Sequence, residues 1–189
     1  MTITWNESLD WAVSSNDPQS TTKGLFNFGK KVIRTMDTLG MMIDVSHTGI
    51  KTIEDILATT TNPILATHCG ACGLVNHRRN LYDNQIEAIA EQGGVIGVPF
   101  CPSFINSSGT ADIDDVIDHI DYIALVAGID HVGIGSDFDG ISDTPQGLED
   151  VSSFPALTIR MLERGYSQEN IEKVLGKNFL RVFEEVCGK

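Results

Sequence analysis

The chain has 189 residues, of which 41% are hydrophobic, and its formal net charge is −13. An acidic surface of this kind disfavours nucleic acids and anionic membranes, because both bind basic faces. No apolar run approaches the roughly 20 residues that span a bilayer, and the first residues lack the basic end and apolar stretch of a signal peptide. We therefore expect a soluble protein for small ligands or metal cations, with neither a nucleic-acid nor a membrane partner.

Apolar residues at helical spacing predict a helix from Leu25 to Leu39, which Gly40 ends. Short apolar runs then alternate with helical segments along the chain. The expected strands cover 41–45, 63–67, 94–100 and 131–136. The expected helices cover 49–59, 82–92 and 112–127. Two more helices are expected between Phe154 and Val186, with Gly165 and Gly176 near their boundaries. Four βα units predict a parallel α/β fold in a single domain, residues 1–189, although the pattern alone leaves open sheet or barrel undecided.

Three polar residues stand where apolar runs end: His47, His68 and Asp137. In a β/α barrel the carboxyl ends of the strands form one cup, so these side chains would gather there. Two neutral imidazoles can hold a zinc ion and leave positions open for water. Asp137 would then serve as general base and acid, while the planar guanidinium of Arg79 suits the free carboxylate of a small peptide.

Structural interpretations compete with these roles. A single histidine at a strand end is more often a hydrogen-bonded core residue than a metal ligand. Asp44 either orients His47 or caps a loop, and Asp139 orders the turn before Gly140. His119 lies on an apolar helical face, and we interpret it as structural.

The four cysteines are too sparse for a disulfide scaffold. Cys69 and Cys72 form a Cys-x-x-Cys pair, but a redox pair belongs early in a small open sheet without a preceding strand-end histidine. A structural zinc site would need a second such pair, which Cys101 and Cys187 do not form. We therefore interpret the cysteines as incidental.

Several segments together resemble the carboxyl-terminal half of the membrane (renal) dipeptidase family of zinc peptidases. They are LGMMIDVSHTG, NPILATH, HRRNLYDNQIEAIAEQGGVIGV, DHIDYIALVAGIDHVGIGSDFDG, GLEDVSSFPALT and GKNFLRVFEEV. The match covers nearly the whole chain, in order and with similar spacing.

The resemblance implies a two-zinc site in a TIM-type (β/α) barrel that hydrolyses dipeptides. His47 and His68 would be ligands of one zinc, Arg79 would hold the terminal carboxylate of the substrate, and Asp137 would transfer protons. The chain would form a partial barrel, about the last four βα units with parallel strands and outer helices, and residues 2–5 would end the fourth strand. Trp5 falls about where some members place a substrate-contacting histidine.

At most half of the family's zinc site is expected here, because its His-x-Asp pair and bridging glutamate come from earlier strands that have no counterpart in the chain. A half barrel exposes unpaired edges, which invite pairing with another chain. A truncated chain is the favoured account, since Met1 stands directly before an expected strand end. The other accounts are a split enzyme completed by its amino-terminal half and a homodimer.

The leading hypothesis for function is zinc-dependent dipeptide hydrolysis by metal-activated water, weak or absent in this chain alone. The alternative is a non-catalytic half barrel that binds a metal or a partner chain. A third hypothesis, another barrel metal hydrolase such as a deaminase or lactonase, is disfavoured by the DFDG turn together with Arg79. The sequence leaves the compartment open, and a bacterial, cytoplasmic setting is only a working assumption.

Overall fold

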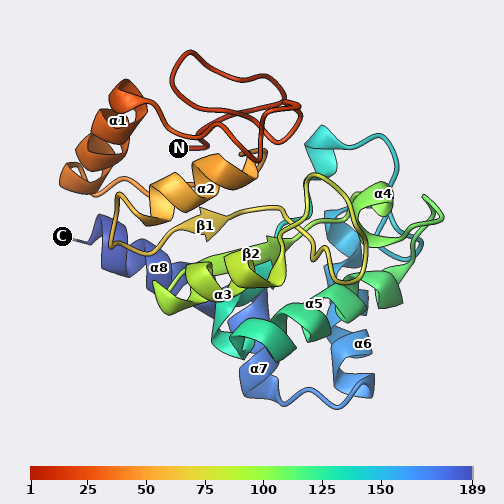
Figure 1. The fold of residues 1–189 in the computed structure, drawn as a ribbon. Coiled ribbons are helices and arrows are strands. Elements are labelled where there is room, and N and C mark those ends of the chain that lie inside the picture. The colour runs from red at the N-terminus through yellow and green to blue at the C-terminus, as the bar shows by residue number, and fades with distance from the viewer. Residues whose placement is uncertain (189) are drawn as a thin grey trace.

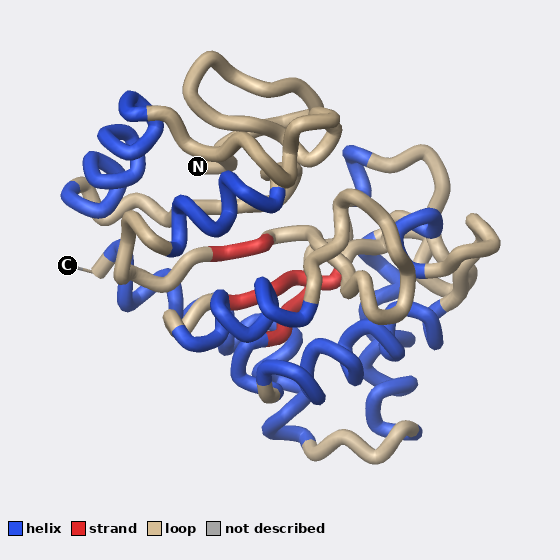
Figure 2. Tube along the Cα trace, viewed as in Figure 1, coloured by secondary structure: helices blue, strands red, loops and turns tan. Residues whose placement is uncertain are grey.

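Three short parallel strands form the sheet of the computed structural model, which describes residues 1–188. They are β1 (Leu65–Ala66), β2 (Val95–Val98) and β3 (Val132–Ile134), hydrogen-bonded in that order. Isolated parallel bridges from Leu65 to Asp44 and from Asp44 to Thr2 add two segments beside β1. The strand arrows run in one direction (Figure 1), and long loops gather at the end to which they point (Figure 2). The expected parallel α/β fold is therefore confirmed.

The segment expected as a strand over 41–45 pairs through Asp44 alone, so that prediction is wrong in extent. Its backbone begins a ladder, in which Leu65 N–H donates to Ile43 O at 2.8 Å. The ladder then stops, because Thr67 N–H donates to the Asp44 carboxylate at 3.0 Å rather than to a backbone carbonyl. A buried side-chain acceptor thus replaces the next backbone hydrogen bond.

The helices agree with their expected ranges to within a few residues at each end. The first four of the expected helices are α1 (Asn27–Thr38), α2 (Ile50–Leu57), α3 (Asp83–Glu91) and α5 (Ile113–Ala127). The tail forms three helices rather than two: α6 (Phe154–Glu163), α7 (Gln168–Glu172) and α8 (Asn178–Cys187). The short α4 (Pro102–Ile105) was not expected, because four residues leave no apolar period to recognise.

Local sequence explains where several helices begin and end. The Asp112 carboxylate accepts hydrogen bonds from the backbone N–H groups of Asp114 and Asp115, which caps α5. The hydroxyl of Ser167 caps α7 in the same way. Gly165 follows α6 with a φ of 88°, a left-handed conformation that glycine adopts without a steric cost.

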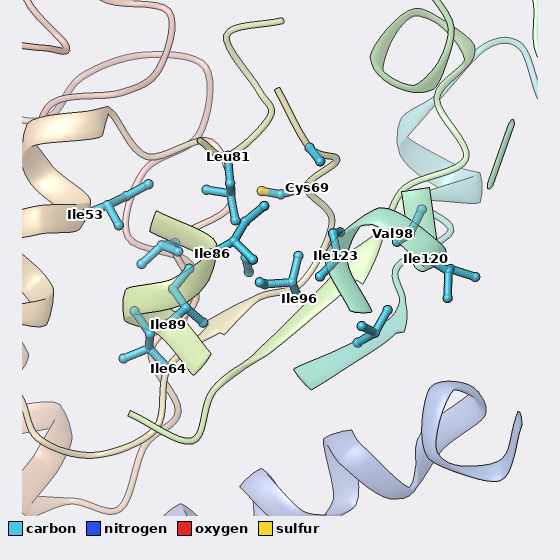
Figure 3. Close-up of a cluster of buried hydrophobic side chains, with 14 of the residues drawn as sticks. Ile53, Ile64, Cys69, Leu81, Ile86, Ile89, Ile96, Val98, Ile120 and Ile123 are labelled. Carbon is cyan, nitrogen blue, oxygen red and sulfur yellow. The ribbon is translucent and has the colours of Figure 1, made fainter. Parts of the chain in front are cut away.

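Isoleucine side chains fill the core on one face of the sheet. Figure 3 shows residues from the sheet region, α3 and α5 converging there: Ile64, Ile96, Ile86, Ile89, Ile120 and Ile123. All of them are fully buried, and burying one such side chain contributes about 1.5–3 kcal/mol. This packed layer fixes the strands whose carboxyl ends carry the predicted site.

The opposite face of the sheet is less completely covered. Leu65 and Val95 pack there against Val182 and Val186 of α8. Beside them lies a cavity of about 670 Å³, lined by the strands, by α8 and by the turn before it, and reaching His68. None of the helices within residues 1–188 combines the length and the apolar character of a membrane span.

Candidate metal and substrate site

His47 and His68 lie side by side at the ends of neighbouring segments of the sheet. Their ring centroids are 5.0 Å apart, and the ring planes are inclined by 68°. His47 has a φ of 66°, in the left-handed region that few residues other than glycine adopt. Backbone conformations of this kind persist only where the surroundings hold them, and they cluster at functional sites. The structure thus brings together the two histidines that the sequence singled out.

Each histidine uses its ring Nδ1 for a hydrogen bond within the chain. His47 Nδ1 lies 3.1 Å from Asn6 Oδ1, and His68 Nδ1 lies 2.9 Å from Thr67 Oγ1. The Nε2 atom of His68 is buried and has no hydrogen-bond partner anywhere in residues 1–188. A buried polar atom without a partner costs free energy. This nitrogen is therefore available to a ligand from outside the chain.

Burial favours the neutral form of both imidazoles. It lowers the pKa of His47 to about 4, and the positive charge of Arg79 acts in the same direction. Burial, assisted again by Arg79, also lowers the pKa of His68. Neutral imidazole with a free Nε2 binds zinc, and a hydrogen bond at Nδ1 fixes the orientation of the ring. The pair therefore fits a zinc ion as two of its ligands.

Arg79 reaches the same region from the loop after β1 and is only 7% exposed. Its guanidinium carbon lies 5.1 Å from the ring centroid of Phe104, and Nη2 donates a long hydrogen bond of 3.5 Å to His68 O. Its buried Nε has no hydrogen-bond partner within the described part of the chain. Burial lowers the pKa of Arg79, but guanidinium remains charged in proteins. A buried cation with a free N–H group suits an anion such as a carboxylate.

The neighbours of Arg79 hold its loop against α4, which carries Phe104. Asn80 Nδ2 donates to Phe104 O at 2.7 Å, and Asn80 Oδ1 accepts from Gly70 N–H at 3.1 Å. The Phe104 ring also stacks on His77, with centroids 4.5 Å apart. Arg79 is therefore supported by an aromatic surface that is itself fixed by hydrogen bonds.

His119, on α5, joins the loop after β1 to α4. Its Nδ1 accepts from Ala71 N–H at 3.0 Å, and its Nε2 lies 3.2 Å from Ile105 O, to which it donates. Burial lowers the pKa of this fully buried ring. With both nitrogens engaged inside the protein, His119 has the structural environment expected from the sequence.

Asp137 follows the segment of β3 and has a φ of 61°, also left-handed. It lines a cavity of about 360 Å³ together with His47 and Arg79. It also lines a second cavity, of about 420 Å³, with His47 and His68. A Cβ atom at Gly140 would lie 2.3 Å from the Asp137 carboxylate, so any other residue there would displace this carboxylate. The structure thus places Asp137 beside both histidines and Arg79.

Other residues singled out in the sequence lie at the edge of the site or outside it. Trp5 is 70% exposed and lines both of these cavities, with its ring centroid 6.4 Å from that of His47. The backbone closes the turn after Asp137, where Gly140 N–H donates to Asp137 O at 2.8 Å, and the side chain of Asp139 is exposed. All four cysteines are free thiols, and burial raises the pKa of Cys69 to about 11, so this thiol is not reactive.

Reasoning from the sequence did not find Asn6, Thr67 or Phe104. Thr67 directly precedes His68, and this adjacency was the one available signal, which is weak because threonine is common in strands. Asn6 and Phe104 are distant in sequence from the histidine and the arginine that they contact. Asp44 was expected to orient His47 or to cap a loop. Its carboxylate accepts from Ser46 N–H at 3.0 Å, which caps the loop that carries His47, and it also bonds to Thr67 beside the other histidine.

Within residues 1–188, no three histidine, cysteine, aspartate or glutamate side chains gather closely enough to hold a metal ion together. The site therefore offers two nitrogen ligands, an aspartate across the cavity and a buried cation. This set can hold a metal in part, bind a carboxylate and transfer a proton.

Three solved structures share the fold of this chain. An amidohydrolase from Pseudomonas aeruginosa is 30% identical to this chain, with a TM-score of 0.92. The match covers 100% of this chain and 64% of the amidohydrolase chain. The probable dipeptidase PvdM from the same organism is 28% identical, with a TM-score of 0.91. The match covers 99% of this chain and 62% of the PvdM chain. A third structure is a metallo peptidase from Rhodobacter sphaeroides, liganded with a phosphinate mimic of the dipeptide L-Ala-D-Ala. It is 30% identical to this chain, with a TM-score of 0.92, and the match covers 98% of this chain and 55% of the peptidase chain.

The chain thus spans between about half and two thirds of the length of these solved structures. The family model described as membrane dipeptidase, peptidase family M19, matches residues 1–188. This match covers nearly the whole chain. The chain belongs to the membrane dipeptidase family.

Proposed function

We propose that this chain forms one side of a zinc-dependent dipeptidase site. In this proposal residues 1–189 are a single domain that corresponds to the carboxyl-terminal half of a (β/α)8 barrel, and the site lies at the carboxyl ends of its strands. The observation that carries the proposal is the pair of neutral imidazoles, with Nδ1 bonded inside the chain and His68 Nε2 left free. Arg79 and Asp137 share the adjoining cavity with His47.

His47 and His68 hold the metal in this proposal. When bound, zinc supplies water activation and polarises the peptide carbonyl. Arg79 binds the terminal carboxylate of the substrate through its guanidinium, whose Nε–H is free, and this fixes the peptide relative to the histidines. Asp137 accepts a proton from the attacking water and donates a proton to the leaving amine.

The size and chemistry of the cavity support a dipeptide as substrate. A volume of about 360 Å³ falls at the lower end of small-molecule sites, which suits a short peptide better than a long chain. The solved relative from Rhodobacter sphaeroides binds a mimic of a dipeptide, which supports the same substrate class. A single buried arginine in the cavity matches the single terminal carboxylate of such a substrate.

We also propose that the chain alone is weak or inactive. Catalytic zinc sites use three protein ligands, and the two histidines supply two. A partner chain, either a second copy or one equivalent to the remaining part of the solved relatives, would have to provide the others. This ligand count also favours the second candidate function, a chain that binds a metal or a partner without catalysis.

Zinc content and dipeptide hydrolysis of the purified chain test the proposal, with the mass in solution recorded. His68→Ala should abolish zinc binding, whereas Asp137→Ala should keep zinc and lose any hydrolysis. Asp139→Ala is the matched control, because its exposed side chain lies two positions away in the same turn. Zinc binding that survives His68→Ala would refute the site, and zinc binding without hydrolysis, even with the partner added, would favour the non-catalytic alternative.

A further inference from the structure

We infer that Asp44 and Thr67 are positioning residues, which hold His68 in the Nδ1–H tautomer and turn its free Nε2 toward the site. The role of Nε2 as a metal ligand rests on the proposed function. The tautomer and its cause rest on the hydrogen bonds alone, so the two can fail separately.

Asp44 is a nearly fully buried carboxylate that accepts four hydrogen bonds. Its Oδ1 accepts from the backbone N–H groups of Ser46 and Thr67, both at 3.0 Å. Its Oδ2 accepts from the hydroxyls of Thr2 at 2.7 Å and Thr67 at 2.8 Å. Burial acts to raise the pKa of Asp44, but these four donors outweigh it and the pKa is lowered. The side chain is therefore an ionised group that can only accept.

This charge fixes the direction of the bonds around Thr67. The Thr67 hydroxyl lies 2.8 Å from Asp44 Oδ2, 2.9 Å from His68 Nδ1 and 3.2 Å from Ser46 Oγ. A hydroxyl has one proton to donate and two lone pairs to accept with. The proton goes to the carboxylate, which has none to offer, so His68 Nδ1 and Ser46 Oγ must both be donors to Thr67.

The Ser46 hydroxyl likewise has one proton to donate and two lone pairs to accept with, and all three are used. Its hydroxyl proton goes to Thr67, and its oxygen accepts from His68 N–H at 3.0 Å and from the Cys69 thiol at 3.6 Å. Every group in the network is thus satisfied in one arrangement only. That arrangement puts the ring proton of His68 on Nδ1 and leaves Nε2 as a bare lone pair, which is the atom without a partner in residues 1–188.

The opposite arrangement fails on the same geometry. If Thr67 donated to His68 Nδ1, its oxygen and Asp44 Oδ2 would face each other at 2.8 Å with no proton between them. The Nε2–H tautomer is the more common one for histidine in water. The network therefore imposes the less common tautomer, and it does so from a residue 24 positions away in the sequence.

Nitrogen NMR of the histidine rings at neutral pH tests the inference without any metal. Two-bond proton–nitrogen correlations distinguish a protonated from an unprotonated ring nitrogen, and we expect the Nδ1–H pattern for His68. Thr67→Val should shift His68 toward the Nε2–H form, and Thr67→Ser should restore Nδ1–H. Thr52→Val is the matched control, because within residues 1–188 the hydroxyl of this buried threonine bonds only to the backbone of Val13.

Asp44→Asn gives the sharpest test. The backbone N–H groups of Ser46 and Thr67 can only donate, so the amide oxygen of the new asparagine should occupy the position of Oδ1. The amide N–H₂ group should then face the hydroxyls of Thr2 and Thr67. Thr67 would then accept from the amide and donate its own proton to His68 Nδ1, which reverses the tautomer. An Nε2–H pattern in the unmodified chain, or an unchanged Nδ1–H pattern in both Asp44→Asn and Thr67→Val, would overturn the inference.

Zinc affinity, measured by competition with a chelating dye, links the tautomer to the metal. We expect Thr67→Val to weaken zinc binding about tenfold, as is usual for partners of metal-bound histidines, and Thr67→Ser to restore it. Equal affinities in a chain whose tautomer has shifted would overturn the link to the metal. No zinc binding by the unmodified chain would count against the proposed function and leave the NMR result to decide the inference.

Discussion

The surroundings of His68 and His47 differ in how they hold an imidazole. The His68 ring is bonded to Thr67, which is bonded in turn to Asp44, inside the protein and beside the packed core. His47 is held by Asn6, an exposed residue, and its ring centroid lies 6.4 Å from that of the exposed Trp5. Both hydrogen bonds are to Nδ1 and have similar lengths. The difference lies in whether solvent can replace the partner.

This difference indicates unequal roles for the two rings. A hydrogen bond inside the protein is worth more than one in water, and losing one partner leaves the other unsatisfied. The His68 side of the site should therefore be rigid before any ligand binds. The His47 ring, whose partner is solvated, should depend more on the ligand to become fixed.

Replacement of Asp44 should have the largest effect. Asp44→Ala leaves two buried N–H groups and two hydroxyls without their acceptor, so we expect a loss of about 2–4 kcal/mol in the free energy of unfolding. Asp44→Asn should cost less, because it keeps an acceptor for the backbone. Urea unfolding measures both, with Asp139→Asn in the exposed turn as the control. Equal stability of Asp44→Ala and the unmodified chain would contradict the buried network.

Phe104→Ala removes the aromatic surface that supports Arg79, and it should have the second-largest effect. A partly buried cation–π contact contributes about 0.5–2 kcal/mol, so dipeptide affinity should fall by between about twofold and roughly thirtyfold. Calorimetry with a dipeptide in the presence of zinc measures this change. Phe28→Ala on the exposed side of α1 is the matched control. An unchanged affinity for Phe104→Ala would show that Arg79 is held without the ring.

The sequence was sufficient to predict the parallel α/β fold and the places where polar residues leave the sheet. Apolar runs that end in His47, His68 and Asp137 carry that information locally, and the structure puts these ends together. The sequence could not reveal the left-handed φ of His47 and Asp137, which depends on the surrounding packing. It also could not reveal that Asp44 ends a strand ladder and supports His68, because both contacts bring together positions more than 20 residues apart.

His119 should make stability depend on pH by a smaller amount. Burial lowers its pKa, so the unfolded chain takes up a proton near pH 6.5 while the folded ring stays neutral. Stability is therefore complete above about pH 6.5 and falls as the pH decreases toward the folded-state pKa, by at most about 1.4 kcal/mol per pH unit for one proton. His119→Gln should make this fall shallower. The same slope in both proteins, measured by urea unfolding across this range, would refute the assignment.

Asn6→Ala should have the smallest effect, and it tests the comparison directly. The bond from His47 to Asn6 is exposed, so water can replace it at a cost of about 0.5 kcal/mol or less. Zinc affinity should then fall no more than about twofold, against the tenfold expected for Thr67→Val. The same dye competition measures both variants side by side. If Asn6→Ala weakened zinc binding as much as Thr67→Val, solvent exposure of the partner would not matter, and the two histidines would be equally fixed by the protein.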